Sequence, residues 1–246
     1  MKKNIKKTSA NTFWLYGRHS VEQALQNPER QKIRLILTKE SEKPDFVPPN
    51  LPVSVENKDF FEAILPKGSV HQGIALEVKP LIPLATEDII RASDSAEKCV
   101  ILILDGVTDI HNTGAIMRSC AAFDVLAVIV TDKNAPNENG TMARSASGAL
   151  DIVPMVRVTN LARSIKQLKD AGFWIIGMDG KAEKTLHELK STLPPKIAVI
   201  MGSEGSGMRS LTLKECDFIA KLPISENMES LNVSVAAGIT LYELCL

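Results

Sequence analysis

The pattern of hydrophobic and polar positions differs between the two parts of the chain. Residues 12–80 contain short periodic segments that predict brief helices and strands. The helices are expected over 20–25 and 58–65, and the strands over 33–37 and 73–78. This pattern predicts a small α/β domain of about 70 residues, near the lower end of the size of independent domains.

The second part of the chain carries longer apolar runs. Near-continuous stretches of Val, Ile and Leu occupy residues 100–105, 125–132, 173–179 and 196–202, and helical patterns such as 112–123 and 161–172 separate them. Strands that are apolar throughout are typical of a parallel sheet covered on both faces, so an α/β fold is predicted for 99–246. Residues 81–98 are predicted to form a linker that contains a short helix.

Composition excludes several classes of protein. The chain has 246 residues, of which 44% are hydrophobic and 24% charged, an ordinary globular balance. It lacks an apolar run of the roughly 18 residues that span a bilayer, and the N-terminus lacks the apolar stretch of a secretory signal. The four cysteines form no C-x-x-C pair, which argues against a zinc ribbon. A cytoplasmic protein with reduced thiols and no membrane partner is expected.

Charge is distributed unevenly although the formal net charge is zero. Residues 1–80 carry 13 Lys and Arg against 9 Asp and Glu, and four of these lysines lie within the first ten residues. A flexible basic arm is therefore predicted over 1–11. Such an arm can bind nucleic acid, and it can equally serve only to keep a protein in solution.

Three clusters of polar residues and glycines follow the apolar runs, where ligands bind in open parallel sheets. They cover residues 104–119, 200–210 and 222–238. The second cluster reads G-x-x-G-x-G from Gly202 to Gly207, which differs from the dinucleotide fingerprint, and the chain contains no P-loop sequence. These features argue against a nucleotide-dependent redox enzyme and a P-loop NTPase. Taken alone, the cluster is only a tight turn between a strand and a helix.

The first cluster contains candidate ligands and a helix start. Asp105, Asp109 and His111 would have to converge from an irregular loop without an evident fourth ligand, so no metal is predicted. Asn112 is predicted to cap the helix that follows. Arg118 falls more than one turn into that helix, where it can reach the ligand crevice or simply pair with a nearby acid such as Asp124.

The third cluster predicts a helix start and an apolar stripe. Ser230 is the expected N-cap. Leu231, Val235, Ile239 and Tyr242 follow at helical spacing. The stripe is expected to pack on the core of its own chain or on a partner chain. Ile116 and Ala122 of the helix in the first cluster are predicted to contribute to the same surface.

In order and spacing, the three clusters resemble the motifs of the SpoU-type ribose 2′-O-methyltransferases of the SPOUT superfamily. Residues 144–150, RSASGAL, match the segment between the first two motifs, and 15–25 and 71–76 resemble the small substrate-binding domain of members that modify large-subunit rRNA. The resemblance implies an L30e-like α/β domain over 12–80. It also implies a SPOUT domain over 99–246 with a deep trefoil knot, bound S-adenosyl-L-methionine and a homodimer formed through the helix of the first motif and the C-terminal helix.

The resemblance also implies roles for individual residues. Arg118 falls on the catalytic arginine and Asn112 on the asparagine that supports it, while Glu204, Ser230 and Asn232 fall on polar positions of the active site. The positions that cradle the cofactor are Met201, Gly202, Leu222, Ile224 and Leu231. The chain departs from the family pattern at Ile110 and Thr113, where Pro and Leu are frequent, and at Glu226, where Gly is common.

The activity implied is methylation of a ribose 2′-hydroxyl in RNA, with a guanosine of 23S rRNA as the leading substrate. The alternatives are a tRNA ribose methyltransferase and a non-catalytic RNA-binding protein of the same fold. The reaction needs no metal, because the sulfonium of the cofactor already activates the methyl group. An arginine keeps its proton throughout the physiological pH range, which disfavours Arg118 as the base, so we expect it to bind a phosphate and stabilise the developing oxyanion.

Overall fold

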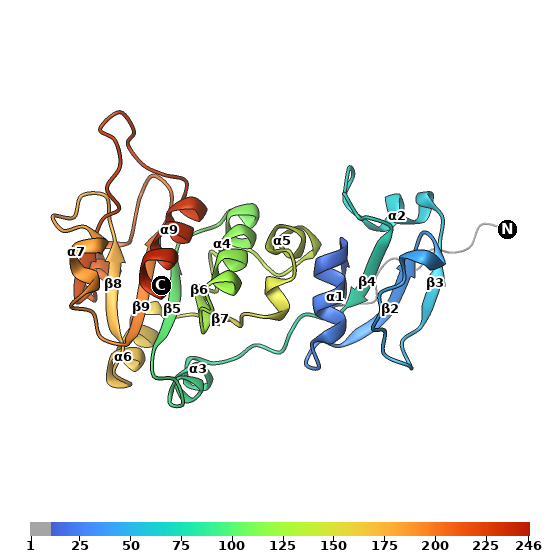
Figure 1. Ribbon diagram of the computed structural model, residues 1–246, viewed down its shortest axis with the longest axis horizontal. Helices are drawn as coiled ribbons and strands as arrows, with labels where there is room; N and C mark the ends of the chain where they lie inside the picture. Colours follow the sequence, from blue (N-terminus) through green and yellow to red (C-terminus); the bar gives the residue numbers. More distant parts are fainter. Residues whose placement is uncertain (1–10) are drawn as a thin grey trace. The chain divides into compact units, whose positions relative to one another are not determined.

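The computed structural model describes residues 11–246 (Figure 1). The predicted basic arm therefore lies outside the described residues, except for Asn11. Internal contacts divide the chain into two compact units. Unit 1 consists of Met1–Ile82 together with Asn137–Ile152, and unit 2 consists of Pro83–Pro136 and Val153–Leu246.

Unit 1 is built on a four-stranded sheet in the order β1-β4-β2-β3. Strand β4 is antiparallel to β1 and β2, whereas β3 is parallel to β2. Its elements are β1 (Phe13–Tyr16), α1 (Arg18–Gln26), β2 (Lys32–Leu37), η1 (Glu40–Glu42), β3 (Val53–Val55), α2 (Lys58–Ile64), β4 (Ile74–Val78), α5 (Gly140–Ala146) and η2 (Ala149–Asp151). The predicted helices and strands of this part are all present, and the strands β1 and β3 were missed.

Unit 2 contains a six-stranded sheet in the order β10-β8-β9-β5-β6-β7, in which all neighbouring strands are parallel. Its elements are α3 (Thr86–Ser93), β5 (Cys99–Asp105), α4 (Ile110–Ala122), β6 (Ala127–Thr131), β7 (Met155–Val158), α6 (Leu161–Asp170), β8 (Trp174–Met178), α7 (Leu186–Lys190), β9 (Lys196–Gly202), α8 (Ser210–Lys214), β10 (Phe218–Ala220) and α9 (Val233–Cys245). The parallel α/β fold is confirmed, whereas the knot stays a prediction.

Helices cover the sheet of unit 2 on both faces. Residues of α3 and α6 join alternate strand residues in one buried cluster that includes Ile89, Ile101, Ile129 and Ile165. Helices α4 and α9 lie side by side in unit 2 (Figure 1). Helix α3 belongs to the stretch predicted as a linker, yet it packs on this core. The domain boundaries themselves stay a prediction.

The register of the sheet brings three loops to one edge. Asp105 at the end of β5 pairs with Gly202 at the end of β9, and Met178 at the end of β8 pairs with Met201. The loops that follow β5, β8 and β9 therefore begin at the same level. This edge is where the sequence predicts the ligand crevice.

Two predicted helix caps are wrong. Asp109 caps α4, because its side chain accepts a hydrogen bond from the backbone N–H of Asn112, which lies within the helix. Asn232, rather than Ser230, caps α9 and accepts from the N–H groups of Ser234 and Val235. In both cases an Asp or Asn within three residues of the predicted cap occupies the position, since a short carboxylate or amide reaches the free N–H groups of the first turn.

Candidate cofactor pocket and catalytic residues

A cavity of about 380 Å³ lies among the loops that follow β8, β9 and β10. It is lined by Met178–Lys181, Met201–Gly207, Lys221, Leu222, Ile224, Glu229–Leu231, Val233 and Ala236. All five residues predicted to cradle the cofactor line this cavity, and so do Glu204 and Ser230. The structure thus brings the second and third motifs together, as the resemblance implies.

Glycines of the second motif serve two different purposes. A Cβ at Gly202 would lie 2.3 Å from Met208 N and from the carbonyl carbon of Gly207, so the loop itself requires this glycine. Gly205 and Gly207 have φ of +80° and +67°, and a Cβ at either would meet open space. The backbone of Gly207 and Met208 thus occupies the space beside Gly202, and the contact of Gly202 with the cofactor stays a prediction.

A buried carboxylate fixes the far end of this loop. Asp105 is 1% exposed and accepts hydrogen bonds from the backbone N–H of Arg209, at 3.0 Å, and from Arg209 Nε, at 2.6 Å. Within the loop, the backbone groups of Ser203 and Gly207 bond reciprocally. Asp105, considered above as a metal ligand, thus holds Arg209 and the loop that lines the cavity.

Glu204 connects all three motifs through one carboxylate oxygen. Its Oε1 accepts from Asn232 Nδ2 at 2.7 Å, from the Val233 N–H at 3.2 Å and from Asn112 Nδ2 at 3.3 Å. Asn232 Nδ2 also donates to Asn112 Oδ1 at 3.0 Å. Three of the residues predicted for the active site, more than 100 positions apart at the extremes, therefore form one polar network beside the cavity.

Comparisons with known proteins place this geometry in a family. The SpoU rRNA methylase family matches residues 99–242, and an RNA 2′-O ribose methyltransferase substrate-binding domain matches residues 14–84. The chain belongs to the SpoU rRNA methylase family. A 23S rRNA (guanosine-2′-O-)-methyltransferase RlmB from Escherichia coli is 37% identical over 93% of this chain and 96% of its own. The RlmB of Photobacterium profundum is 45% identical over 72% and 71%.

Solved structures show the same SpoU fold. The SpoU methyltransferase AviRb from Streptomyces viridochromogenes superimposes with a TM-score of 0.81 at 19% identity, covering 96% of this chain and 89% of AviRb. AviRb in complex with the cofactor AdoMet gives a TM-score of 0.80 at 21% identity, with 99% and 92% covered. At these identities the similarity concerns the fold alone.

Arg118 stands apart from the SpoU pocket. It lies on the exposed surface of α4, does not line the cavity, and forms no ion pair with Asp124 or with any other acid among residues 11–246. The neighbouring face of α4 packs on α9, where Ser119 lies against Gly238 and Phe123 contacts Tyr242 edge to face. Arg118 is thus presented at the surface beside the contact of α4 with α9.

The sequence analysis missed one wall of the pocket. Met178–Lys181 follow β8 and line the cavity, as does Lys221 after β10. The signal was present, because the run at 173–179 ends in an Asp followed by a glycine at the same edge of the sheet as the other motifs. A Cβ at Gly180 would meet nothing within 4 Å, so this lining position has room for a side chain. In the part of the chain that the structure describes, no helix is long and apolar enough to cross a membrane.

Proposed function

We propose that this protein transfers the methyl group of S-adenosyl-L-methionine to a ribose 2′-hydroxyl of 23S rRNA, at a guanosine. The observation that carries the proposal is the network in which Glu204 joins Asn112 and Asn232 beside a glycine-rich cavity. Family membership and the activity for which the RlmB relatives are named support the reaction and the RNA class.

The cavity fits S-adenosyl-L-methionine in size and in chemistry. Its volume of about 380 Å³ lies within the range of small-molecule sites. The apolar side chains of Met201, Leu222, Ile224 and Leu231 suit an adenine ring, and the open backbone at Gly205 and Gly207 suits close contact with a ribose. When bound, the cofactor supplies an electrophilic methyl group with a neutral thioether as leaving group.

The residues of this chain have to orient the RNA and stabilise charge on the attacking oxygen. Arg118 carries a permanent positive charge and has no carboxylate partner among residues 11–246, so its guanidinium is available for a phosphate of the RNA. Held there, it stabilises negative charge as it develops on the ribose oxygen. The Asn112–Glu204–Asn232 network fixes the start of α9 against the start of α4 and so maintains the walls of the pocket.

The exposed face of α9 supports a homodimer. Val235, Ile239 and Tyr242 are 50%, 44% and 57% exposed, as expected for an apolar stripe that a second copy covers. Ile116, assigned to the same surface from the sequence, is fully buried in its own chain, whereas Ala122 is exposed. In such a dimer Arg118 lies close to the interface. Sedimentation should give a dimer, and Ile239→Asp should give a monomer; a monomeric wild type contradicts the assembly.

The decisive experiment measures methyl transfer and maps the product. The protein is incubated with labelled S-adenosyl-L-methionine and either 23S rRNA or tRNA, and 2′-O-methylated nucleotides are located. Label at one guanosine of 23S rRNA is expected; label on tRNA alone, or on neither RNA, overturns the proposal. For the pocket, calorimetry should show weaker cofactor binding by Gly180→Trp, since Gly180 lines the cavity and has room for a side chain.

A further inference from the structure

Residues 137–152 belong to unit 1 although they lie inside the stretch that the SpoU methylase family matches. Ser20 Oγ on α1 donates a buried hydrogen bond of 2.8 Å to the carbonyl oxygen of Ala143 on α5. Asn27 Nδ2 donates to Asp151 Oδ1 at 3.0 Å. Helix α5 and η2 are therefore built onto α1 and β1 and form part of the RNA substrate-binding unit.

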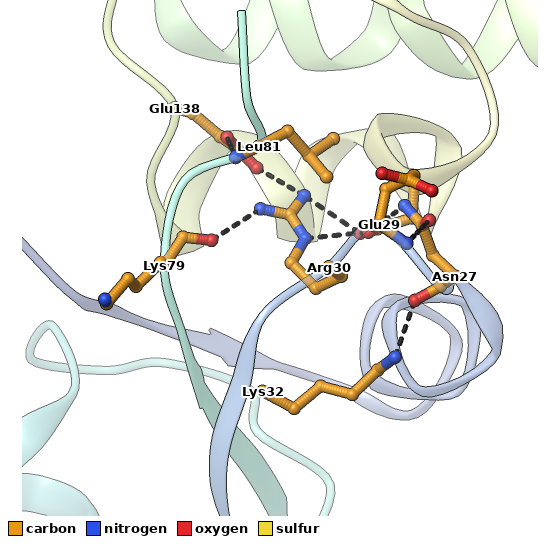
Figure 2. Close-up of polar contacts among 8 residues, drawn as sticks. Asn27, Glu29, Arg30, Lys32, Lys79, Leu81 and Glu138 are labelled. Atoms are coloured by element: carbon orange, nitrogen blue, oxygen red, sulfur yellow. Dashed lines mark hydrogen bonds and ion pairs between the residues drawn. The ribbon is translucent and has the colours of Figure 1, made fainter.

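The buried Arg30 binds residues 137–152 to the rest of unit 1 through ion pairs. The Arg30 side chain is fully buried, and its Nε lies 2.8 Å from Asp151 Oδ1, while one terminal nitrogen lies 2.5 Å from Glu138 Oε1. The other terminal nitrogen donates to the carbonyl oxygen of Lys79 at 3.1 Å. Figure 2 shows Arg30 next to the Lys79 carbonyl and the Glu138 carboxylate. Both carboxylates of residues 137–152 are thus paired with Arg30.

Glycines allow the two parts to approach closely. A Cβ at Gly140 would lie 2.2 Å from the carbonyl oxygen of Trp14, and one at Gly148 would lie 3.0 Å from that of His19. Gly17, with φ of +84°, lies against the Arg144 side chain, whose Cδ would be 3.0 Å from a Cβ at this position. The packing therefore sets the stem of Arg144 directly on the backbone that precedes Arg18.

Arg144 is left with an unsatisfied charge at this surface. Among the described residues Arg144 forms no ion pair, whereas Arg18 pairs with Glu22 and the two acids of the segment, Glu138 and Asp151, pair with Arg30. Its stem is half-buried, and Arg18 and His19 next to it are exposed. A guanidinium held in place without an anion is suited to bidentate contact with a phosphate.

We infer that Arg144, together with Arg18 and His19, forms a phosphate-binding site for the RNA substrate on unit 1. The site is composite, because Arg144 comes from the methylase stretch and the other two come from the substrate-binding domain. The inference rests on the proposed function, since it supplies a contact to the same RNA. Arg144 contacts the sugar-phosphate backbone and so contributes to affinity for RNA and not to the choice of base.

The test compares three arginine variants for binding to a 23S rRNA transcript over a range of salt concentrations. Arg144→Gln should weaken binding about tenfold at low salt and reduce the salt dependence by about one counterion. Arg144→Lys should retain part of the affinity because it keeps the charge. The matched control is Arg163→Gln, an exposed arginine on α6 of unit 2, which should bind as the wild type does. Affinity for S-adenosyl-L-methionine should be unchanged in all three.

Three results contradict the inference, and they can be told apart. If the wild type binds and methylates 23S rRNA but Arg144→Gln binds within twofold of it, the phosphate site is wrong and the proposed function stands. If Arg144→Gln and Arg144→Lys weaken binding equally with no change in salt dependence, Arg144 acts through packing alone and the phosphate site is wrong. Failure of the wild type to bind 23S rRNA overturns both proposals.

Discussion

Two places in the molecule join segments that are far apart in the sequence, and they use different chemistry to do so. In unit 1, the fully buried Arg30 binds Asp151 and Glu138, whose side chains are 2% and 13% exposed. In unit 2, Glu204 and Asn232 are exposed to solvent, and with Asn112 they form a network around one carboxylate oxygen.

The buried ion pairs of Arg30 are expected to matter mainly for stability, and the exposed network of Glu204 mainly for ligand binding. Burial lowers the pKa of Arg30, but the hydrogen bond and charge of Asp151, with the charge of Glu138, raise it by more, so the pKa is raised overall. The buried cluster must stay fully paired, because each of its charges is cut off from water. Water can replace the partners of Glu204, so the exposed network can be lost or rearranged around a ligand at small cost in stability.

Removing Arg30 should give the largest effect on stability. Arg30→Ala leaves Asp151 and Glu138 buried without a cation, which should lower the free energy of unfolding by about 3–5 kcal/mol. Arg91→Ala is the matched control, because Arg91 forms only an exposed pair with Asp88 and should cost about 0–1 kcal/mol. Urea unfolding measures both. Equal losses of unfolding free energy in the two variants would show that the buried cluster stabilises the protein no more than an exposed ion pair does.

Arg118 should give the largest effect on catalysis with almost none on stability. Arg118→Ala should slow single-turnover methyl transfer by about 10²–10³, or about 2.7–4 kcal/mol, if Arg118 stabilises charge in the transition state. Arg118→Lys should recover little, since a lysine lacks the bidentate fork. Calorimetry should show cofactor affinity within twofold of the wild type. A rate within threefold of the wild type for the alanine variant would exclude a catalytic role.

Glu204 tests the exposed network directly. Glu204→Ala removes the acceptor of three N–H groups, so cofactor affinity should fall about tenfold, or about 1.4 kcal/mol. The free energy of unfolding should change by less than about 1 kcal/mol, because the carboxylate is exposed. Calorimetry and urea unfolding provide the two values. A large loss of stability with unchanged cofactor affinity would show that the Glu204 network stabilises the fold, as the Arg30 cluster does, and does not serve cofactor binding.

The smallest expected effect is a dependence of unit 1 stability on pH through His71. Burial lowers the pKa of His71 from its ordinary value of 6.5, and the charge of Lys58 lowers it further, whereas Glu42 and Glu62 oppose the shift. His71 stacks on Phe61, and its Nδ1 accepts the Gly73 N–H, which favours the neutral ring.

Because the unfolded chain takes up this proton first, stability should fall as the pH drops below about 6.5. Between pH 7 and 5.5 the melting temperature of the wild type should fall more than that of His71→Gln, by less than about 2 °C. Identical slopes for the two proteins would show that His71 does not titrate differently on folding.

Sequence patterns predicted the long elements well and the short ones poorly. The apolar runs that became β5, β6, β8 and β9 were each placed within two residues of their ends. Strands β7 and β10 have only four and three residues, too few for a periodicity to stand out. The resemblance located Gly202, Glu204 and Leu222 on the cavity, but their individual roles stay a prediction.

Contacts between distant segments were beyond the reach of any local pattern. Nothing in the sequence around Arg30 indicates that its partners lie at positions 138 and 151, since an isolated arginine after a helix is usually a surface residue. Likewise, Asp105 was evaluated as a metal ligand because its partner Arg209 is 104 positions away. Long-range ion pairs depend on the topology of the chain, which periodicity does not specify.

Because residues 137–152 belong to unit 1, the ribosome synthesises part of unit 2 before unit 1 is complete. The peptide chain crosses from one unit to the other after Ile82, after Pro136 and after Ile152. Unit 1 therefore remains unfinished while β5 and β6 are translated, and the apolar positions that receive Met142 and Ala146 stay uncovered until residue 152 leaves the ribosome. Cutting the chain near residue 96 would likewise separate α5 from β1 and α1, on which it packs, so one cut cannot separate the two units intact.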